Sequence, residues 1–366
     1  MKIGFDAKRA FLNNSGLGNY SRLVIEEVAK QSNNTVFAYT KSWGNLNYKP
    51  QNVSIKTPTG FYSLIPRTWR SRGIVSDLKR DGINLYHGLS GELPIGLSSE
   101  KIAQVVTIHD LIFLRYPELY KSYDRAIYKK KFRSAVEVAD KVVAISSQTK
   151  SDLLEFFTIS ESRIELIYQD CDVQFRQILS KDAIEFVHTK YALPSEYVLS
   201  VGTIEKRKNQ LLTLKAAKEV GIPVVFIGKH TGYVNELKTY VSENKLEGKV
   251  YFLNDVSFSD FPAIYQGASV FMYPSIFEGF GIPILEALRS RVPVITSKGS
   301  CFEETGGAAT QYIGDSLEEA MVSLSKVLES RDLREGMIED GVDHAQKFNV
   351  EKTIPQLLKV YDDIKR

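Results

Sequence analysis

Short apolar runs alternate with amphipathic helical patterns along almost the whole chain, and this rhythm constrains the fold more than any other feature. Residues 105–108 and 142–145 are runs of apolar and β-branched side chains without polar alternation. Strands of this kind are covered on both faces, as in a parallel sheet flanked by helices. Repeated strand–helix units therefore predict an α/β fold with doubly wound sheets.

The rhythm occurs in two series, one in each half of the chain. In the first half, the expected strands are 2–6, 35–40, 83–87, 104–108, 141–145 and 163–167, and the expected helices are 17–31, 71–80, 124–139 and 147–157. In the second half, the expected strands are 197–202, 223–228, 249–253, 269–273 and 292–296, and the expected helices are 208–219, 232–245, 282–290, 316–329 and 331–347. Two series predict two Rossmann-like domains facing a crevice, with ligands at the carboxyl ends of the strands.

The segment 168–196 interrupts the rhythm and marks the junction between the domains. At roughly 150 residues per domain, a chain of 366 residues has room for two. We place the first domain at residues 1–182 and the second at 190–349. Residues 351–365 carry apolar side chains at helical spacing, which predicts a final amphipathic helix.

Composition and charge narrow the class of protein. The two cysteines, Cys171 and Cys301, are too few for a disulfide framework or a metal cluster. No stretch approaches the roughly 18–20 apolar residues of a spanning helix, and no signal-peptide core is present, so we expect a cytoplasmic protein. Residues 1–180 hold 25 Lys and Arg against 18 Asp and Glu, whereas the remainder holds 22 against 26. The halves are expected to have different partners, and the acidic second half argues against nucleic acid.

The strongest local feature is the block 277–286, which follows an expected strand. Gly279 and Gly281 allow a tight turn and a close approach to a ligand, and Pro283 suits the first turn of a helix. The backbone N–H groups of residues 280–282 would then form an anion site at the helix N-terminus, which suits a diphosphate.

Two carboxylates frame this block. Glu278 precedes the expected helix and Glu286 projects from its first turns, so the two side chains reach different parts of an extended ligand. Carboxylates accept hydrogen bonds from sugar and ribose hydroxyls. A Gly-rich turn in which Glu286 stabilises the helix dipole is the alternative, and the residues alone leave both interpretations open.

A basic turn, Lys206-Arg207-Lys208, closes the expected strand 197–202 and opens the next helix. Cations at the carboxyl end of a strand are placed to neutralise a leaving diphosphate. A solvated basic turn is the alternative. The anion site expected on the same sheet favours the ligand-binding interpretation.

The first half offers weaker signals. Gly16 and Gly18 lie in a strand-to-helix turn like a dinucleotide fingerprint, but Ser21 stands where the third Gly or Ala belongs. A tight loop that approaches a ligand and an ordinary turn both remain open. His109 ends an expected strand, where it would bond a sugar hydroxyl or phosphate or merely cap the strand. His87 has the same two interpretations as His109, and we regard it as the weaker candidate.

Other polar features have competing interpretations. Asp170 and Asp172 form an Asp-x-Asp triplet of the kind that binds a divalent ion with a nucleotide diphosphate. We favour a turn with local side-chain caps, because the basic turn already supplies the charge of a metal. The segments 61–73 and 125–133 mix aromatic and basic residues, which suits anionic lipid or a lipid-diphosphate acceptor. A loop with buried aromatics and a solvated helix face is the alternative.

These motifs resemble those of the family-4 glycosyltransferases, a retaining group with the GT-B fold that includes many bacterial mannosyl- and glucosyltransferases. The resemblance spans nearly the whole chain. Glu278 and Glu286 match the Glu-x7-Glu signature, and 202–209 resembles the Gly-Thr-x-Glu-Pro-Arg-Lys-Asn turn with Lys206 in place of proline. The remaining blocks that resemble the family are 16–18, His109-Asp110 and 167–175, the last with Asp170 where glycine is usual.

The resemblance implies a role for each matched residue. Arg207 and Lys208 would contact the donor diphosphate, Glu278 the donor sugar and Glu286 the ribose, with His109 beside the sugar. The other expected contacts of the donor are Gly16, Gly18, Thr203, Gly279, Phe280, Gly281 and Ile282. The family usually needs no metal or other cofactor, and its last helix, here 350–366, usually crosses back onto the first domain.

The sequence thus predicts a retaining hexosyltransferase, with GDP-mannose as the leading donor and a glycan or lipid-linked acceptor in surface polysaccharide assembly. A UDP-sugar donor and a sugar-nucleotide epimerase of the same architecture are the alternatives. A dehydrogenase fits less well because the glycine fingerprint is incomplete. A basic protein that binds nucleic acid or lipid is the non-enzyme rival, and it would show no preference among sugar nucleotides.

Overall fold

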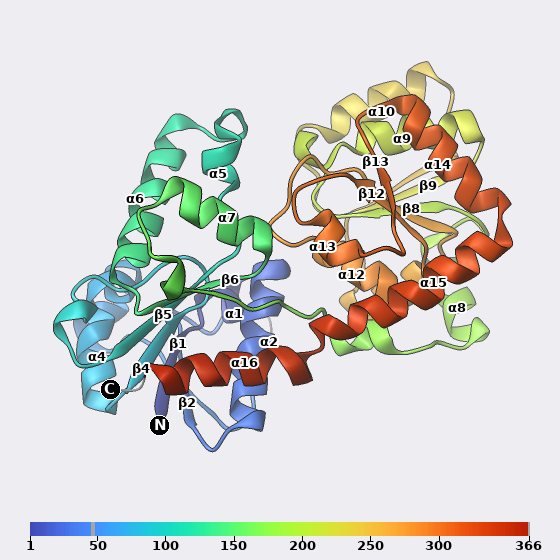
Figure 1. Cartoon of the computed structure of the whole chain (residues 1–366). Helices are drawn as coiled ribbons and strands as arrows, with labels where there is room; N and C mark the ends of the chain where they lie inside the picture. The colour runs from blue at the N-terminus through green and yellow to red at the C-terminus, as the bar shows by residue number, and fades with distance from the viewer. Residues whose placement is uncertain (45–47, 365–366) are drawn as a thin grey trace. The chain divides into compact units, whose positions relative to one another are not determined.

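The computed structural model describes residues 1–44 and 48–364, which divide into two compact units (Figure 1). The first unit contains Met1–Asp170 and Phe348–Arg366, and the second contains Cys171–Lys347. Each unit is built on one parallel sheet with helices packed on its faces. The predicted α/β class with two doubly wound sheets is confirmed.

Among the described residues, the first unit has a seven-stranded parallel sheet in the order β3-β2-β1-β4-β5-β6-β7. Its strands are β1 (Lys2–Asp6), β2 (Thr35–Tyr39), β3 (Val53–Lys56), β4 (Leu85–Gly88), β5 (Ala103–Ile108), β6 (Lys141–Ala144) and β7 (Ile164–Leu166). Its helices include α1 (Lys8–Leu12), α2 (Gly16–Gln31), α3 (Pro66–Thr68), α4 (Ile74–Asp81), α5 (Ile112–Arg115), α6 (Ser122–Val138), α7 (Ser147–Phe156) and α16 (Val350–Asp363). The order reverses between β1 and β4, where a doubly wound sheet forms its ligand site.

The apolar runs of the sequence become strands buried on both faces. Val105 packs in the cluster that includes residues of α2 and α16, whereas its neighbour Val106 packs with residues of α6 and α7. Successive side chains of a strand point to opposite faces, so both had to be apolar.

The last helix, α16, packs on the first unit beside α2 (Figure 1). Its Ile354, Leu357 and Tyr361 are buried in the same cluster as Val24 and Ile25 of α2. The predicted apolar stripe of 351–365 is therefore the face that contacts this core. Of the predicted segment 350–366, residues 365–366 lie outside the described residues.

Within the described part of the chain, the second unit has a six-stranded parallel sheet in the order β10-β9-β8-β11-β12-β13. Its strands are β8 (Val198–Val201), β9 (Val224–Ile227), β10 (Val250–Leu253), β11 (Val270–Tyr273), β12 (Val294–Ser297) and β13 (Gln311–Ile313). Its helices include α8 (Lys181–Tyr191), α9 (Gln210–Val220), α10 (Val234–Glu243), α11 (Phe261–Gln266), α12 (Ile282–Arg289), α13 (Phe302–Gly306), α14 (Leu317–Glu329) and α15 (Arg331–Ala345). Here the order reverses between β8 and β11.

The unit boundary differs from the one predicted at residues 182–190. The structure divides after Asp170, because residues 171–182 pack on the second unit. The Phe175 ring lies 5.5 Å from that of Tyr265, centroid to centroid, and the Leu179 N–H donates to Gln266 Oε1 at 3.0 Å. The second unit ends at Lys347 rather than at residue 349.

Two strands were not predicted, β3 and β13, and both lie at sheet edges. Neither is an apolar run, because an edge strand is covered less completely, and apart from Ile313 the side chains of these two strands are partly buried or exposed. None of the described helices combines the length and the apolar character needed to cross a bilayer.

Candidate active site

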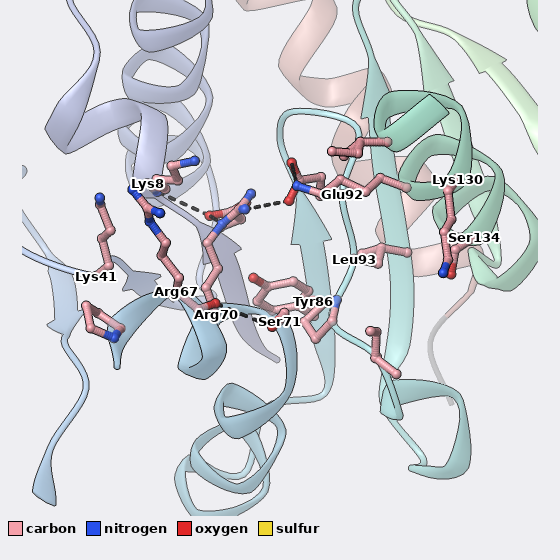
Figure 2. Close-up of a pocket in the computed structure, with 16 residues that line it drawn as sticks. Lys8, Lys41, Arg67, Arg70, Ser71, Tyr86, Glu92, Leu93, Lys130 and Ser134 are labelled. Carbon is pink, nitrogen blue, oxygen red and sulfur yellow. Dashed lines mark hydrogen bonds and ion pairs between the residues drawn. The ribbon is translucent and has the colours of Figure 1, made fainter. Parts of the chain in front are cut away.

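A pocket of about 670 Å³ opens at the carboxyl ends of β1 and β4 in the first unit (Figure 2). Arg70, from the turn before α4, donates to both carboxylate oxygens of Asp6 and, at 2.5 Å, to Glu92. Lys131 of α6 pairs with the other Glu92 oxygen at 3.2 Å. Burial favours a raised pKa for Asp6, but Arg70 outweighs it, so the pKa is lowered. Arg70, predicted as part of a basic surface, is therefore committed to two carboxylates.

Gly16 and Gly18 form the first turn of α2, which begins at Gly16. A Cβ at Gly18 would meet the Asn13 carbonyl oxygen at 1.9 Å, whereas one at Gly16 would meet nothing within 4 Å. Close packing of the preceding loop thus explains Gly18 without a ligand. The donor contacts predicted for both residues stay predictions.

The two candidate histidines of the first unit have different surroundings. His87 is buried, and its ring nitrogens bond Tyr361 of α16 at 2.6 Å and Thr107 at 2.8 Å. It therefore anchors the last helix. The ring of His109 is half-buried; its Nε2 donates to the Leu89 carbonyl at 2.9 Å, and burial lowers its pKa to about 4. His109 is neutral near pH 7, which leaves Nδ1 as a hydrogen-bond acceptor.

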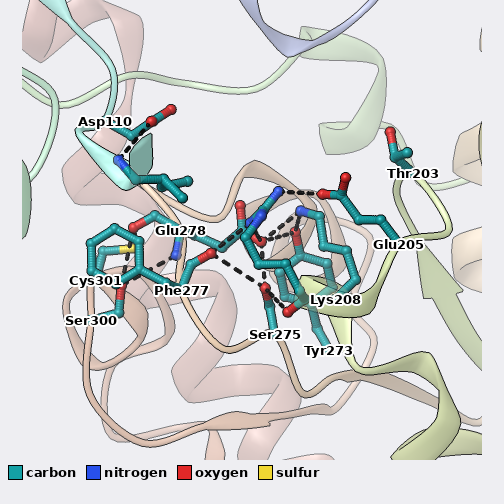
Figure 3. A network of polar contacts seen from close by, with 12 residues as sticks. Asp110, Thr203, Glu205, Lys208, Tyr273, Ser275, Phe277, Glu278, Ser300 and Cys301 are labelled. Atoms are coloured by element: carbon teal, nitrogen blue, oxygen red, sulfur yellow. Dashed lines mark hydrogen bonds and ion pairs between the residues drawn. The ribbon is translucent and has the colours of Figure 1, made fainter. Parts of the chain in front are cut away.

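In the second unit, the basic turn after β8 and the loop after β11 lie together at the sheet's reversal point (Figure 3). Their backbones are tied, because the Arg207 carbonyl accepts from the Ile276 N–H at 2.8 Å and from the Ser275 hydroxyl at 3.2 Å. The prediction that the basic turn and the 277–286 block share one edge of the sheet is confirmed.

Glu278 is the centre of a polar network between these loops. Its Oε1 accepts from Lys208 Nζ at 2.6 Å, Arg207 Nη1 at 2.7 Å, the Ser275 hydroxyl at 2.6 Å and the Tyr273 hydroxyl at 3.0 Å. Lys208 also donates to the Tyr273 hydroxyl. Within the described residues, Glu278 Oε2 accepts no hydrogen bond, so one oxygen remains for a ligand.

Burial makes the charges of this network interdependent. Glu278 and Lys208 are each only 9% exposed. Burial alone would raise the pKa of Glu278, but Lys208 and Arg207 outweigh it and lower the pKa to about 2. Burial lowers the pKa of Lys208, and Arg207 adds to this, whereas Glu278 opposes it. The carboxylate therefore stays ionised and helps its lysine to hold a proton.

The loop from Glu278 to α12 is fixed by the segment 300–305. The Ser300 hydroxyl donates to the Glu278 carbonyl at 3.0 Å, and the Thr305 hydroxyl donates to the Phe280 carbonyl. Gly281 has φ of 85°, a left-handed conformation that favours glycine. The predicted tight turn is thus confirmed at Gly281, and α12 begins at the next residue, Ile282.

The second carboxylate, Glu286, lies in a different environment. It is buried in α12 and accepts from the Tyr265 hydroxyl at 2.9 Å. Burial raises its pKa to about 7, and the charge of Asp172 adds to the rise. The two glutamates of the 277–286 block therefore differ in pKa: the pKa of Glu278 is lowered to about 2, and the pKa of Glu286 is raised to about 7.

Thr203 lies in the turn between β8 and the basic residues. Its carbonyl accepts from Gln210 Nε2 at 3.0 Å, which fixes the turn against the start of α9. A Cβ at Gly228, after β9, would meet the Gly202 carbonyl at 2.1 Å. This close approach was missed from the sequence. The contacts of Tyr273, the last residue of β11, and of Ser275, two residues after it, were missed as well.

The two acidic side chains of the triplet at the junction accept backbone hydrogen bonds. Asp170 accepts from the Val350 N–H at 3.0 Å, and Asp172 accepts from the Gln174 N–H at 3.0 Å. Asp172 is a local cap of the kind predicted, whereas Asp170 accepts from the first residue of α16, which is distant in the chain.

Two units, each with a doubly wound parallel sheet and charged side chains where its strand order reverses, define a two-domain α/β protein, and comparisons identify the family. The model "Glycosyl transferases group 1" matches residues 183–344, and the model "Glycosyltransferase Family 4" matches residues 14–175. The chain belongs to the family-4 glycosyltransferases of the GT-B fold, and it is an enzyme of glycosyl transfer.

Its relatives include bacterial mannosyltransferases. It is 27% identical over 288 residues to O-antigen chain mannosyltransferase B of Escherichia coli, covering 76% of this chain and 74% of that protein. It is 29% identical over 230 residues to O-antigen chain mannosyltransferase RfbU of Salmonella typhimurium, covering 62% of this chain and 61% of that one. In fold it resembles HepE of Anabaena, solved with UDP, with a TM-score of 0.76 at 16% identity, 99% of this chain and 100% of that one.

Proposed function

We propose that this chain transfers a hexosyl group from a nucleoside-diphosphate sugar to a hydroxyl of a glycan or lipid-linked acceptor, with retention at the anomeric carbon. The observation that carries the proposal is the Glu278 network, in which two cations and a carboxylate with an open oxygen share one sheet edge. GDP-mannose is the proposed donor, supported by the names of the mannosyltransferases that the chain resembles. The same names support a role in surface polysaccharide assembly.

The physical task is to stabilise a leaving group that gains charge. As the bond from the anomeric carbon to the diphosphate oxygen breaks, its electron pair goes to that oxygen. The acceptor oxygen forms the new bond, and its proton passes to the diphosphate. In this proposal, Arg207 and Lys208, which Glu278 holds in place, stabilise the developing negative charge without reorganisation. A metal ion is not needed for this step.

Glu278 acts in this proposal as a fixed anion rather than as a nucleophile. Its pKa of about 2 makes it a weak base, and its Oε1 is already occupied by four donors. Its Oε2 would accept a hydroxyl of the donor sugar, while Glu286 would accept the ribose hydroxyls. The carboxylate thereby orients the sugar and keeps Lys208 charged.

The predicted membrane contact of 61–73 and 125–133 stays a prediction. Phe61 and Leu64 are 71% and 78% exposed, beside the exposed Arg67. The cytoplasmic location also stays a prediction.

Slow donor hydrolysis tests the proposal without knowledge of the acceptor. The purified protein is incubated with GDP-mannose, UDP-glucose and other nucleotide sugars, and the released sugar is observed by NMR. We expect one donor to be cleaved with an α-anomer as the first product. First formation of the β-anomer would contradict retention. Conversion to an epimer without cleavage would favour the epimerase.

A further inference from the structure

Ser300 lies beside Glu278 in the second unit, on the loop after β12 (Figure 3). The Ser300 hydroxyl donates to the Glu278 carbonyl at 3.0 Å and accepts from the Glu278 N–H at 3.3 Å. The Cys301 thiol adds a weaker contact to the same carbonyl at 3.4 Å. One side chain from a neighbouring loop therefore holds both backbone hydrogen-bonding groups of the residue at the centre of the polar network.

Ser300 adopts a backbone conformation that serine does not favour. Its φ is 54°, in the left-handed region, where a residue with a Cβ is strained and glycine is not. The preceding residue, Gly299, adopts φ of 81° in the same turn. A strained backbone persists only where the surrounding structure holds it in place, and such residues cluster at ligand sites. Glycine at position 300 would relieve the strain, so the hydroxyl is what serine contributes there.

The loop that carries Glu278 has few restraints of its own. Two glycines, Gly279 and Gly281, follow Glu278 within three residues, and glycine restricts the backbone least. At the end of the Glu278 side chain, four donors hold Oε1, so a change of the backbone is the movement that would redirect Oε2. Ser300 opposes that movement, because it fixes the peptide groups on both sides of the Glu278 Cα atom.

We propose that Ser300 is a positioning residue of the donor site, whose hydroxyl fixes the Glu278 backbone and thereby directs Glu278 Oε2 toward a hydroxyl of the donor sugar. The inference rests on the proposed function, because it concerns the contact with the donor sugar. Ser300 touches no reacting atom and acts through Glu278. Its loss therefore weakens the sugar contact and leaves the nucleotide contacts in place.

The test separates the hydroxyl from the strain with two substitutions at one position. Ser300→Ala removes the hydroxyl and keeps the strain, whereas Ser300→Gly removes both. Arg291→Gly is the control, because Arg291 is exposed, has φ of 61° and lies in the turn between α12 and β12. Thermal unfolding, donor cleavage and calorimetric binding of the free nucleotide are measured for each variant, with the donor that the wild type cleaves, GDP-mannose and GDP first.

The two Ser300 variants are expected to differ in stability and to agree in activity. Ser300→Gly should unfold at a higher temperature than Ser300→Ala, because glycine relieves the left-handed strain. Both should lose roughly tenfold or more in kcat for donor cleavage, since small errors of position are costly. KM and nucleotide binding should change little, because slow cleavage makes KM a measure of binding. Arg291→Gly should keep the wild-type kcat.

Three outcomes would overturn the proposal. Wild-type kcat in both Ser300 variants would show that the hydroxyl does not orient Glu278. A loss in Ser300→Ala with recovery in Ser300→Gly would show that backbone strain or stability alone decides activity. A loss of nucleotide binding in parallel with kcat would show that the whole loop is displaced, which is a structural role.

Failure of the proposed function appears in the wild type, whereas failure of this inference appears in the variants. A wild type that binds no nucleotide and cleaves no nucleotide sugar would contradict the donor site, and the inference would fall with it. A wild type that cleaves a donor no faster than the two Ser300 variants would overturn the inference alone.

Discussion

The two units carry ion networks at equivalent places, after the central strands where the order of each sheet reverses, but the charges balance differently. In the second unit, Lys208 and Arg207 are both paired with Glu278. In the first, Arg70 satisfies Asp6 and Glu92, while Lys8, Lys41 and Arg67 remain around the pocket. Both units thus hold a preassembled ion network where the strand order reverses, but only in the first does a pocket lined by further cations lie beside that network.

Arg70→Gln tests the first-unit network and has the largest expected effect. It leaves the buried Asp6 carboxylate without its cation, which typically costs about 3–5 kcal/mol of unfolding free energy. Chemical denaturation measures this loss, with the exposed Arg72→Gln as the matched control. Equal stability of both variants would show that Arg70 does not hold the network.

Lys208→Ala tests the second-unit network. Removing a preorganised group that stabilises developing charge typically lowers turnover roughly 100- to 1,000-fold. Lys206→Ala is the control, because the Lys206 side chain lies in the same turn but is 72% exposed. Donor cleavage rates measure the difference, and near-normal activity of Lys208→Ala would remove this residue from the mechanism.

Glu286→Gln tests whether the pKa of the second carboxylate is raised, through the pH dependence of protein stability. The folded pKa of Glu286 is about 7 against an ordinary 4.5, so the folded state binds more protons between these values. Stability contributed by Glu286 is thus full below pH 4.5 and declines as pH rises to 7. The variant is expected to flatten this decline in denaturation experiments, whereas exposed Glu329→Gln should keep it. Parallel curves for wild type and Glu286→Gln would contradict the raised pKa.

His109→Ala has the smallest expected effect. A single neutral hydrogen bond contributes about 1 kcal/mol, so kcat/KM should fall about five- to tenfold. Because the pKa of His109 is about 4, its protonation should not limit the wild-type rate between pH 6 and 8. A rate that depends on a titrating group near pH 6.5 and loses that dependence in His109→Ala would contradict a neutral role.

Much of this arrangement follows from local sequence. The paired sheets follow from apolar runs, and the meeting of Lys208 with Glu278 follows from the rule that parallel strands end at one edge. Tyr273 and Ser275 were within reach of the same rule. Tyr265 was not, because its contact with Glu286 depends on how α11 packs beside α12.

Less of the first-unit pocket could be predicted from the sequence. Arg67 and Arg70 are three residues apart, yet one lies exposed at a pocket and the other pairs with a carboxylate of β1. The sequence shows that Arg67 and Arg70 are both positively charged. It does not show that Arg70 pairs with Asp6, because Asp6 is distant in the chain. The edge strands β3 and β13 were missed for the same reason, because tertiary packing decides them. Packing also decides that the first unit divides at Asp170, within the predicted junction 168–196 but before the predicted domain end at residue 182.

The most direct test of the central claim is thermal stability with GDP, UDP, ADP and dTDP, each with and without a chelator. A ligand at a hundred times its dissociation constant stabilises a protein by roughly 2.7 kcal/mol, which raises the melting temperature measurably. We predict that one nucleotide, GDP first among them, stabilises the wild type equally in both conditions and stabilises Glu286→Gln less. Absence of stabilisation by every nucleotide, or its loss with the chelator, would contradict a metal-independent donor site in the second unit.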